Sequence, residues 1–293
     1  MNTKLRGTGV AIITPFDSNR NIDFNALKKL LEFNISSGVN YFVVLGTTGE
    51  SATLTKDEKK QVYEFVKKAV NGRVGLVAGI GGNNTAEVID TIKHFDHTGY
   101  DAILSVSPYY NKPSQAGIYE HFIAIAKDAP LPILIYNVPS RTGSNITADT
   151  TLKLAHASNK FIGVKEASGN LTQCSIIAKH RPKDFLLISG DDIITLPMLS
   201  FGADGVISVL ANCCPKDFSA MVKAALAFDF KTAAPLHLKL VEITELLFAE
   251  GSPGGVKAAL NVLGICENVL RLPLVPVNDG LREKIKKELS SLK

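Results

Sequence analysis

The sequence contains no tryptophan, and only four of its 293 residues are cysteines. The four are Cys174, Cys213, Cys214 and Cys266. None forms a Cys-x-x-Cys pair and no histidine cluster accompanies them, so the pattern excludes the usual structural zinc sites. So few cysteines also exclude a disulfide-stabilised secreted scaffold. We therefore expect reduced thiols in a cytoplasmic protein that holds no metal.

Long apolar runs and blocks of a single charge are also absent. No run approaches the roughly 20 residues of a transmembrane helix, and the N-terminus has no apolar signal core, so we expect no membrane partner. The 32 basic and 28 acidic residues are mixed along the chain, with a formal net charge of +4. Without a basic stripe, nucleic acid is not an expected partner. The small positive excess suits a small anionic substrate.

What the chain does contain is a regular alternation of short apolar runs and amphipathic segments. Hydrophobic residues make up 45% of the sequence, enough for a large core. The eight apolar runs span residues 10–13, 41–45, 74–78, 102–106, 133–135, 161–164, 185–188 and 205–207. Eight buried strands, each followed by a helix, predict an α/β fold of the parallel (β/α)8 TIM barrel type. A doubly wound open sheet is the alternative, since strand count alone does not prove closure.

Helix start signals support this pattern. Asp23 precedes a helical apolar stripe, Thr55 and Glu58 form a capping box pattern, and Thr85 opens a third segment. After about Ala225 the alternation stops and only helical patterns remain. We therefore predict a catalytic barrel over residues 1–225 and a C-terminal helical appendage over residues 226–293.

Polar side chains gather where the apolar runs end. In (β/α)8 barrels, the loops after the strands build the active site. The residues at these ends are Thr14, Thr47, Thr48, Glu50, Tyr109, Tyr110, Tyr136, Asn137, Lys165, Ser189, Asp191, Asp192 and Ser208. The paired aspartates lack a third ligand at a recognisable spacing, so we expect no metal there.

Lys165 is the strongest candidate for a nucleophile. It follows the apolar residues Phe161, Ile162 and Val164, at the point where that run stops. A poorly solvated amine favours its neutral form, which attacks a carbonyl to give a Schiff base. The alternative is a strand-end lysine that reaches solvent or pairs with Glu166.

Three further features fit a site for a small carboxylate substrate. The stretch Gly46–Glu50 has glycines and two hydroxyl groups suited to an anion, or it is an ordinary tight turn. Arg141 follows the fifth strand and suits a carboxylate, or it is a solvated surface arginine. Tyr136 ends that strand next to the lysine strand, as a proton shuttle or as a core tyrosine.

Taken together, three motifs resemble the dihydrodipicolinate synthase family of the class I pyruvate lyase/aldolase superfamily, which also holds N-acetylneuraminate lyase. They are Gly46-Thr47-Thr48-Gly49-Glu50-Ser51, Tyr136-Asn137-Val138-Pro139-Ser140-Arg141-Thr142-Gly143 and Gly163-Val164-Lys165-Glu166-Ala167-Ser168. The resemblance covers nearly the whole chain. It implies a lyase of lysine biosynthesis through diaminopimelate, with no cofactor. The expected substrates are pyruvate and L-aspartate 4-semialdehyde, in a homotetramer built as a dimer of dimers.

The resemblance also implies individual roles. Lys165 would form the Schiff base, and Thr48, Tyr136 and Tyr110 would form a proton relay, with Tyr110 lent by a neighbouring subunit. Thr47 and Thr48 would hold the pyruvate carboxylate. Arg141 would bind the carboxylate of the semialdehyde. The carbonyl of Gly190 and the backbone around Ile207 would line the pocket.

In lysine-sensitive members of the family, a feedback site lies at the tight-dimer interface. The matching residues here are Ser51, Ala52, Asn83, Glu87 and Tyr109. Two positions that are histidine in sensitive enzymes are Lys56 and Lys59 here, and their charges would repel a cationic ligand. We therefore expect weak or absent inhibition by lysine.

Other functions remain open from the sequence. A 2-keto-3-deoxy sugar-acid aldolase or an N-acetylneuraminate lyase would use the same lysine, although sialic acid lyases typically lack an arginine like Arg141. A non-catalytic keto-acid sensor is the third hypothesis. Binding alone requires neither the lysine nor its proton relay, so the motifs argue against the sensor.

Overall fold

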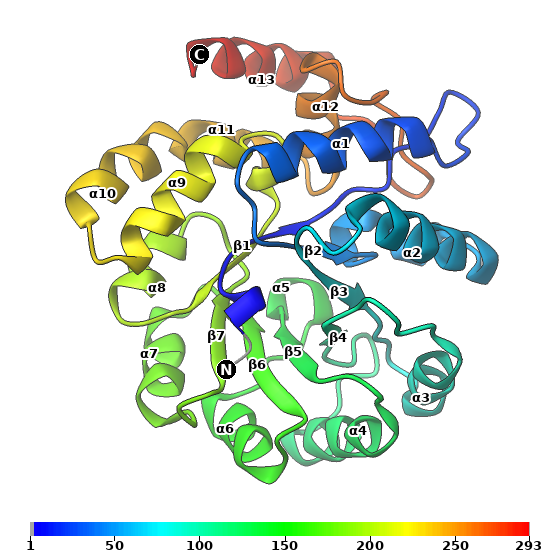
Figure 1. Ribbon diagram of the computed structural model, residues 1–293, viewed down its shortest axis with the longest axis vertical. Helices are drawn as coiled ribbons and strands as arrows, with labels where there is room; N and C mark the ends of the chain where they lie inside the picture. Colours follow the sequence, from blue (N-terminus) through cyan, green and yellow to red (C-terminus); the bar gives the residue numbers. More distant parts are fainter. Residues whose placement is uncertain (1–2, 293) are drawn as a thin grey trace.

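The computed structural model describes residues 3–292 and contains a closed barrel of eight parallel strands in sequential order (Figure 1). The strands are β1 (Gly7–Ala11), β2 (Tyr41–Val44), β3 (Gly75–Gly79), β4 (Ala102–Val106), β5 (Ile133–Asn137), β6 (Phe161–Glu166), β7 (Leu186–Ser189) and β8 (Gly205–Ser208). Pairing of β1 with β8 closes the barrel, with Gly7 opposite Gly205. This closure confirms the (β/α)8 prediction and excludes the doubly wound alternative.

Helices surround the barrel on its outside (Figure 1). Those between strands are α1 (Phe24–Ser36), α2 (Lys56–Val70), α3 (Thr85–His94), α4 (Gln115–Asp128), α5 (Pro139–Thr142), α6 (Ala148–Ala157), α7 (Leu171–His180) and α8 (Thr195–Ser200). Those after β8 are α9 (Pro215–Leu226), α10 (Phe230–Lys239), α11 (Val241–Phe248), α12 (Gly254–Val262) and α13 (Asp279–Ser291). Residues 3–292 also contain four short 3₁₀ helices: η1 (Thr3–Leu5), η2 (Thr47–Gly49), η3 (Ser51–Thr53) and η4 (Leu210–Asn212).

Both faces of the strands are buried, which explains their nearly continuous apolar character. One set of side chains fills the barrel interior, including Tyr41, Leu104, Leu134 and Ile188. The alternate set packs under the surrounding helices in a second, larger apolar cluster. The barrel is thus a packed core, and a ligand site must lie at one of its ends.

The predicted strand boundaries need correction at the ends. The first strand begins at Gly7, three residues before the apolar run, because glycine and threonine there are buried against neighbouring strands. The sixth strand continues through Lys165 and Glu166, so the lysine lies inside the strand and not just beyond it. Apolarity marks the buried part of a strand, whereas backbone pairing extends further.

The predicted helix starts are confirmed. Asp23 caps α1, and Thr55 with Glu58 forms a complete capping box at the start of α2. The third helix begins at Thr85, with Asn84 as its N-cap. The side chain of Asn84, one residue before the predicted start, accepts the N–H of Ala86 and so caps this helix.

The helices after α9 pack on the barrel through shared apolar contacts. Val256 of α12 and Ile285 of α13 belong to the same apolar cluster as the outer barrel. In Figure 1, α12 and α13 lie near α1, and Lys29 of α1 donates to the carbonyl of Gly264 at 2.6 Å. The division into two domains remains a prediction. Between residues 3 and 292, no helix is both long and apolar enough to cross a bilayer.

Candidate active site

Lys165 lies buried at the C-terminal end of the barrel, with 5% of its surface exposed. Strand pairing sets it opposite Tyr136 on one side and Ile188 on the other. Its Nζ lies 4.2 Å from the centre of the Tyr136 ring. Because the side chain is buried, it does not reach solvent, and among the described residues it forms no ion pair. The arrangement is therefore that of a buried amine held against a phenol, which suits a nucleophile.

Because Gly190 has no side chain, the Lys165 side chain can occupy the space next to it. A Cβ atom at position 190 would lie 3.0 Å from Lys165 Cε and 2.7 Å from Ala167 Cβ, both too close without a shift. The backbone N–H of Gly190 donates to the carbonyl of Glu166 at 2.8 Å, which fixes this glycine beside the lysine strand. The predicted pocket residue Ile207 is buried in the same inner cluster as Tyr136.

The loop after β2 carries the two predicted anion-binding threonines. They form the 3₁₀ turn η2, in which Thr47 is exposed and Thr48 is buried. The hydroxyl of Thr14, from the end of the first predicted run, donates to the carbonyl of Gly49 at 2.7 Å. The loop is therefore an ordered turn that this hydrogen bond joins to the barrel. Its role as an anion site stays a prediction, with an ordinary tight turn as the alternative.

Arg141 sits on the short helix α5, with an exposed side chain whose Nη2 lies 3.4 Å from the carbonyl of Ser252. The loop that carries it is held by Asn137, which accepts from the N–H of Ile146 and donates to the buried carboxylate of Glu166 at 3.0 Å. Glu166 thus binds amide groups and not Lys165, contrary to the pairing alternative. Asn137 has a structural role here.

Tyr109 and Tyr110 follow β4 on a surface loop. Tyr110 is 89% exposed, and within residues 3–292 its phenol takes part in no hydrogen bond. Tyr109 is 42% exposed, and its carbonyl accepts from Asn83 at 3.1 Å. The single chain therefore does not enclose Tyr110 in its own site, in keeping with a role at a neighbouring subunit.

Several contacts at the site were not predicted from the sequence. The carboxylate of Glu50, at the end of the β2 loop, pairs with Lys257 of α12 and accepts from the N–H of Arg271. Lys257 stands alone among apolar residues in the stretch Gly254–Leu260, and a single charge in a buried helix is a signal that could have marked it.

A groove of about 800 Å³ brings most of the predicted feedback residues together. It is formed largely by α2 and α3, and Ser51, Asn83, Glu87 and Tyr109 all line it. Lys56 and Lys59 line it as well, whereas Ala52 is exposed outside the lining. Burial, and next the charge of Lys56, lower the pKa of Lys59 from its ordinary value. Charges of both signs thus line the α2 side of the groove, where Asp57 and Glu64 accompany the lysines.

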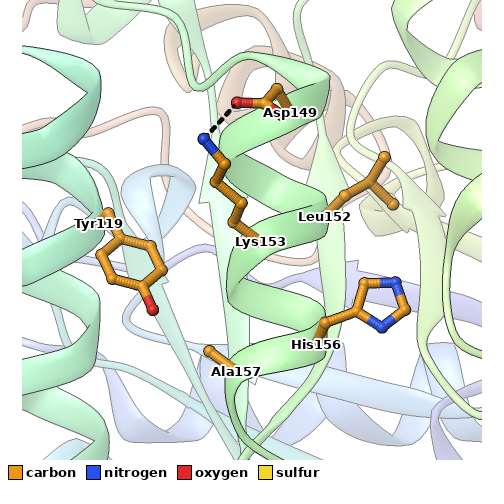
Figure 2. A pocket seen from close by; sticks show the side chains of 6 residues that line it. All are labelled: Tyr119, Asp149, Leu152, Lys153, His156 and Ala157. Atoms are coloured by element: carbon orange, nitrogen blue, oxygen red, sulfur yellow. Dashed lines mark ion pairs between the residues drawn. The ribbon is translucent and has the colours of Figure 1, made fainter.

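A second hollow lies between α4 and α6, on the outside of the barrel (Figure 2). Figure 2 shows Tyr119 from one helix facing Lys153 and Ala157 from the other, and Lys153 pairs with Asp149 at 2.9 Å. No residue from a strand end lines this hollow. It is an inter-helix surface depression without the chemistry of the barrel end.

The histidines, cysteines and carboxylates do not form a metal centre. Across residues 3–292, no group of three or more such side chains has a metal-binding arrangement. Asp192 instead accepts from the N–H groups of Val209 and Leu210, and burial raises the pKa of its carboxyl. The four cysteines are free thiols.

Comparisons with known proteins match this chain over nearly its full length. The sequence model of the dihydrodipicolinate synthetase family matches residues 4–292. A 4-hydroxy-tetrahydrodipicolinate synthase from Phocaeicola vulgatus is 49% identical, covering 100% of this chain and 99% of the relative. The structure of a dihydrodipicolinate synthase from Aquifex aeolicus has 42% identity and a TM-score of 0.95, covering 98% of both chains.

A further solved relative is a dihydrodipicolinate synthase from Acinetobacter baumannii complexed with pyruvate. It is 38% identical with a TM-score of 0.95, covering 98% of this chain and 99% of that one. Family model, relatives and solved structures thus agree with the resemblance that the three motifs indicated. The chain belongs to the dihydrodipicolinate synthetase family.

Proposed function

We propose that this protein condenses pyruvate with L-aspartate 4-semialdehyde to 4-hydroxy-tetrahydrodipicolinate, through a Schiff base on Lys165. The observation that carries the proposal is the buried amine of Lys165, held 4.2 Å from the Tyr136 ring at the C-terminal end of the barrel. A relative whose structure contains pyruvate supports the choice of the first substrate. The names of the relatives support the choice of the product.

In this mechanism the neutral amine attacks the C2 carbonyl of pyruvate, and loss of water gives the imine. Loss of a methyl proton converts the imine to an enamine, whose carbon attacks the aldehyde. The amino group of the semialdehyde then attacks the imine carbon, which closes the ring and frees the lysine. Each step moves a proton, so a relay of hydroxyl groups near the amine has a direct use.

We assign that relay to Tyr136, Thr48 and Tyr110, with the last supplied by the neighbouring subunit. Thr47 and Thr48 bind the pyruvate carboxylate through hydroxyl and backbone N–H groups of the η2 turn. Arg141 binds the carboxylate of the semialdehyde, and its exposed position suits the substrate that arrives second. The Gly190 carbonyl and the backbone around Ile207 line the pocket, and no metal or organic cofactor is needed.

The assembly belongs to the proposal as well. A tyrosine that is 89% exposed is unusual unless another molecule covers it, and Tyr110 lies beside the groove residue Tyr109. A dimer that buries this loop would complete each active site with the partner's tyrosine. Two such dimers would give the proposed homotetramer.

The aldehyde can be identified by competition for the trapped intermediate. Protein and pyruvate are mixed with L-aspartate 4-semialdehyde, N-acetylmannosamine or glyceraldehyde, and borohydride is added at timed intervals. We expect only the semialdehyde to deplete the reducible adduct and to yield the cyclic product. Depletion by N-acetylmannosamine or glyceraldehyde alone would instead assign a sialic acid lyase or a sugar-acid aldolase. An adduct that no aldehyde depletes would favour the sensor.

A further inference from the structure

Glu50 and Lys257 form an ion pair in the interior of the protein. Nζ of Lys257 lies 2.5 Å from one carboxylate oxygen of Glu50, and both side chains are 0% exposed. Of the ion pairs formed within residues 3–292, only this one has both side chains fully buried. The two residues are 207 positions apart in the chain, since 257 minus 50 is 207. The pair therefore joins the β2 loop to the C-terminal helices.

Stability alone does not explain such a pair. Taking two charges out of water is costly, and buried ion pairs are often no more stabilising than apolar residues of the same volume. Burial lowers the pKa of Lys257, while the neighbouring Glu50 carboxylate acts in the opposite direction. Fixing one geometry is the best-attested use of a buried pair, and the surrounding contacts show what is fixed here.

Lys257 and Glu50 each make further contacts besides their ion pair. Lys257 also donates to the carbonyl of Val269 at 2.8 Å, and its Nζ lies 4.0 Å from the centre of the Phe16 ring. The second carboxylate oxygen of Glu50 accepts from the N–H of Arg271 at 3.1 Å. Arg271 in turn binds the carboxylate of Glu58 through two nitrogens. The carboxylate of Glu50 is thus held from the segment 257–271 on both oxygens.

The backbone of Glu50 is also constrained. It has φ 51° and ψ 34°, in the left-handed region that non-glycine residues seldom adopt. Its N–H donates to the carbonyl of Thr47 at 3.1 Å and so closes the η2 turn. A side chain anchored in the C-terminal region therefore holds the residue that closes the turn carrying Thr47 and Thr48.

We propose that Glu50 and Lys257 are positioning residues for the pyruvate-binding turn, so that the C-terminal helices set the geometry in which Thr47 and Thr48 bind the pyruvate carboxylate. The inference rests on the proposed function and deepens it. Neither residue touches substrate in this account. Both act through the turn, and their loss affects pyruvate more than the semialdehyde, which Arg141 binds from another loop.

The test uses the full-length protein and the double variant Glu50→Gln/Lys257→Met. Removing both charges together avoids an unpaired buried charge, which would threaten folding. Glu50→Gln alone is the second variant, since glutamine keeps an acceptor for the N–H of Arg271 and burial already favours the uncharged form of Lys257. Lys239→Met is the matched control, because it breaks an exposed pair with Asp217 on the C-terminal helices, away from the turn. Thermal unfolding and intact assembly are checked for each variant before kinetics.

We expect the double variant to raise the KM for pyruvate about tenfold and to slow borohydride trapping of pyruvate, since small misplacements of binding groups cost up to about 10²-fold. The KM for the semialdehyde should change by less than about twofold, because Arg141 binds that substrate from a different loop. A folded double variant with unchanged pyruvate KM would overturn the proposal, as would an equal loss for both substrates. If the native protein traps no pyruvate at all, the proposed function itself fails, which is a separate result.

Discussion

At the scale of single residues, the site depends on how little room surrounds Lys165. Its side chain runs past Gly190 and against the ring of Tyr136, so both the direction and the burial of the amine are set by neighbours on adjacent strands. Among the described residues no carboxylate forms an ion pair with this lysine, so its side chain remains available to a carbonyl substrate. The chemistry therefore relies on packing as much as on the lysine itself.

Gly190→Ala tests this dependence on packing. The added Cβ would lie 2.7 Å from Ala167 Cβ, which requires a shift there, and 3.0 Å from Lys165 Cε, which requires the lysine side chain to give by a few tenths of an ångström. We expect pyruvate trapping to slow by about 10²-fold, with a loss of about 1–3 kcal/mol in the free energy of unfolding from overpacking. Gly280→Ala on α13 is the control, and it should trap pyruvate at the native rate. Native trapping in Gly190→Ala would contradict this account of the site.

At the scale of elements, the helices α2 and α3 enclose the groove that holds the predicted feedback residues. Lys56 and Lys59 from α2 both line it, and the lowered pKa of Lys59 reflects burial and then the charge of Lys56. A cationic amino acid bound next to Lys56 and Lys59 would meet like charges at close range, which disfavours its binding. The two α2 lysines are therefore the basis for expecting weak or absent inhibition by lysine.

We predict that lysine at millimolar concentration leaves the activity of the native protein nearly unchanged. Replacing two of the four lysines that line the groove, as Lys56→His/Lys59→His, should allow inhibition, measured as a fall in the rate of product formation with added lysine. Lys68→His, on the same helix but outside the groove lining, is the control and should remain insensitive. Strong inhibition of the native protein at micromolar lysine would refute the prediction.

The start of α2 is joined to the C-terminal region by a second ion pair. Hydrogen bonds from Arg271 lower the pKa of Glu58 to about 2 from its ordinary 4.5. A carboxyl whose pKa is depressed by folding stabilises the protein above its ordinary pKa, and that contribution is lost as the pH falls through the folded value. The contribution of Glu58 should therefore disappear between about pH 4.5 and pH 2.

Glu58→Gln tests this assignment, because glutamine keeps the capping box with Thr55 but removes the charge. At neutral pH the native protein should be more stable by about 1 kcal/mol, a modest value because both partners are partly exposed. Thermal unfolding from pH 7 to pH 2 should show this advantage vanishing below pH 4.5. Glu64→Gln, an exposed position on α2, should show no such pH dependence. A constant difference between native protein and Glu58→Gln would contradict the assignment.

Sequence patterns predicted the barrel and the helix starts, because burial periodicity and capping are local properties, whereas the family followed from the resemblance of three motifs. They did not predict the Glu50–Lys257 pair, since only the fold brings residues so far apart in the chain together. In the sequence, Glu50 and Asn137 were only two of several polar residues at strand ends. In the structure, each of them holds a loop in place through its side chain. Strand boundaries were also missed where buried glycine, threonine or lysine continues the pairing.

At the scale of the whole molecule, the proposed site would draw on the C-terminal helices and on the surface loop with Tyr110 as well as on the barrel. The C-terminal helices reach the β2 loop through Lys257. The side chain of Tyr110 is 89% exposed on its own chain. If a neighbouring subunit supplies Tyr110, one complete site needs two chains. Symmetric dimers would then contain two shared sites.

Mixing inactive variants tests this sharing. Lys165→Ala and Tyr110→Phe are each expected to have little activity, but a mixed dimer would contain one site with a native lysine and a native tyrosine. After co-refolding in equal amounts, random pairing should restore about a quarter of native activity. Mixing two batches of the same variant is the control. No recovery, with mixed assemblies verified by mass, would place Tyr110 outside the partner's site.

The most direct test of the central claim is the intact mass of the protein after incubation with pyruvate and borohydride. The account predicts one reduced pyruvate adduct per chain on the native protein, located at Lys165 by peptide mapping, and no adduct on Lys165→Ala. A native protein that gains no adduct, or an equal adduct on Lys165→Ala, would contradict the assignment of Lys165 as the Schiff-base lysine.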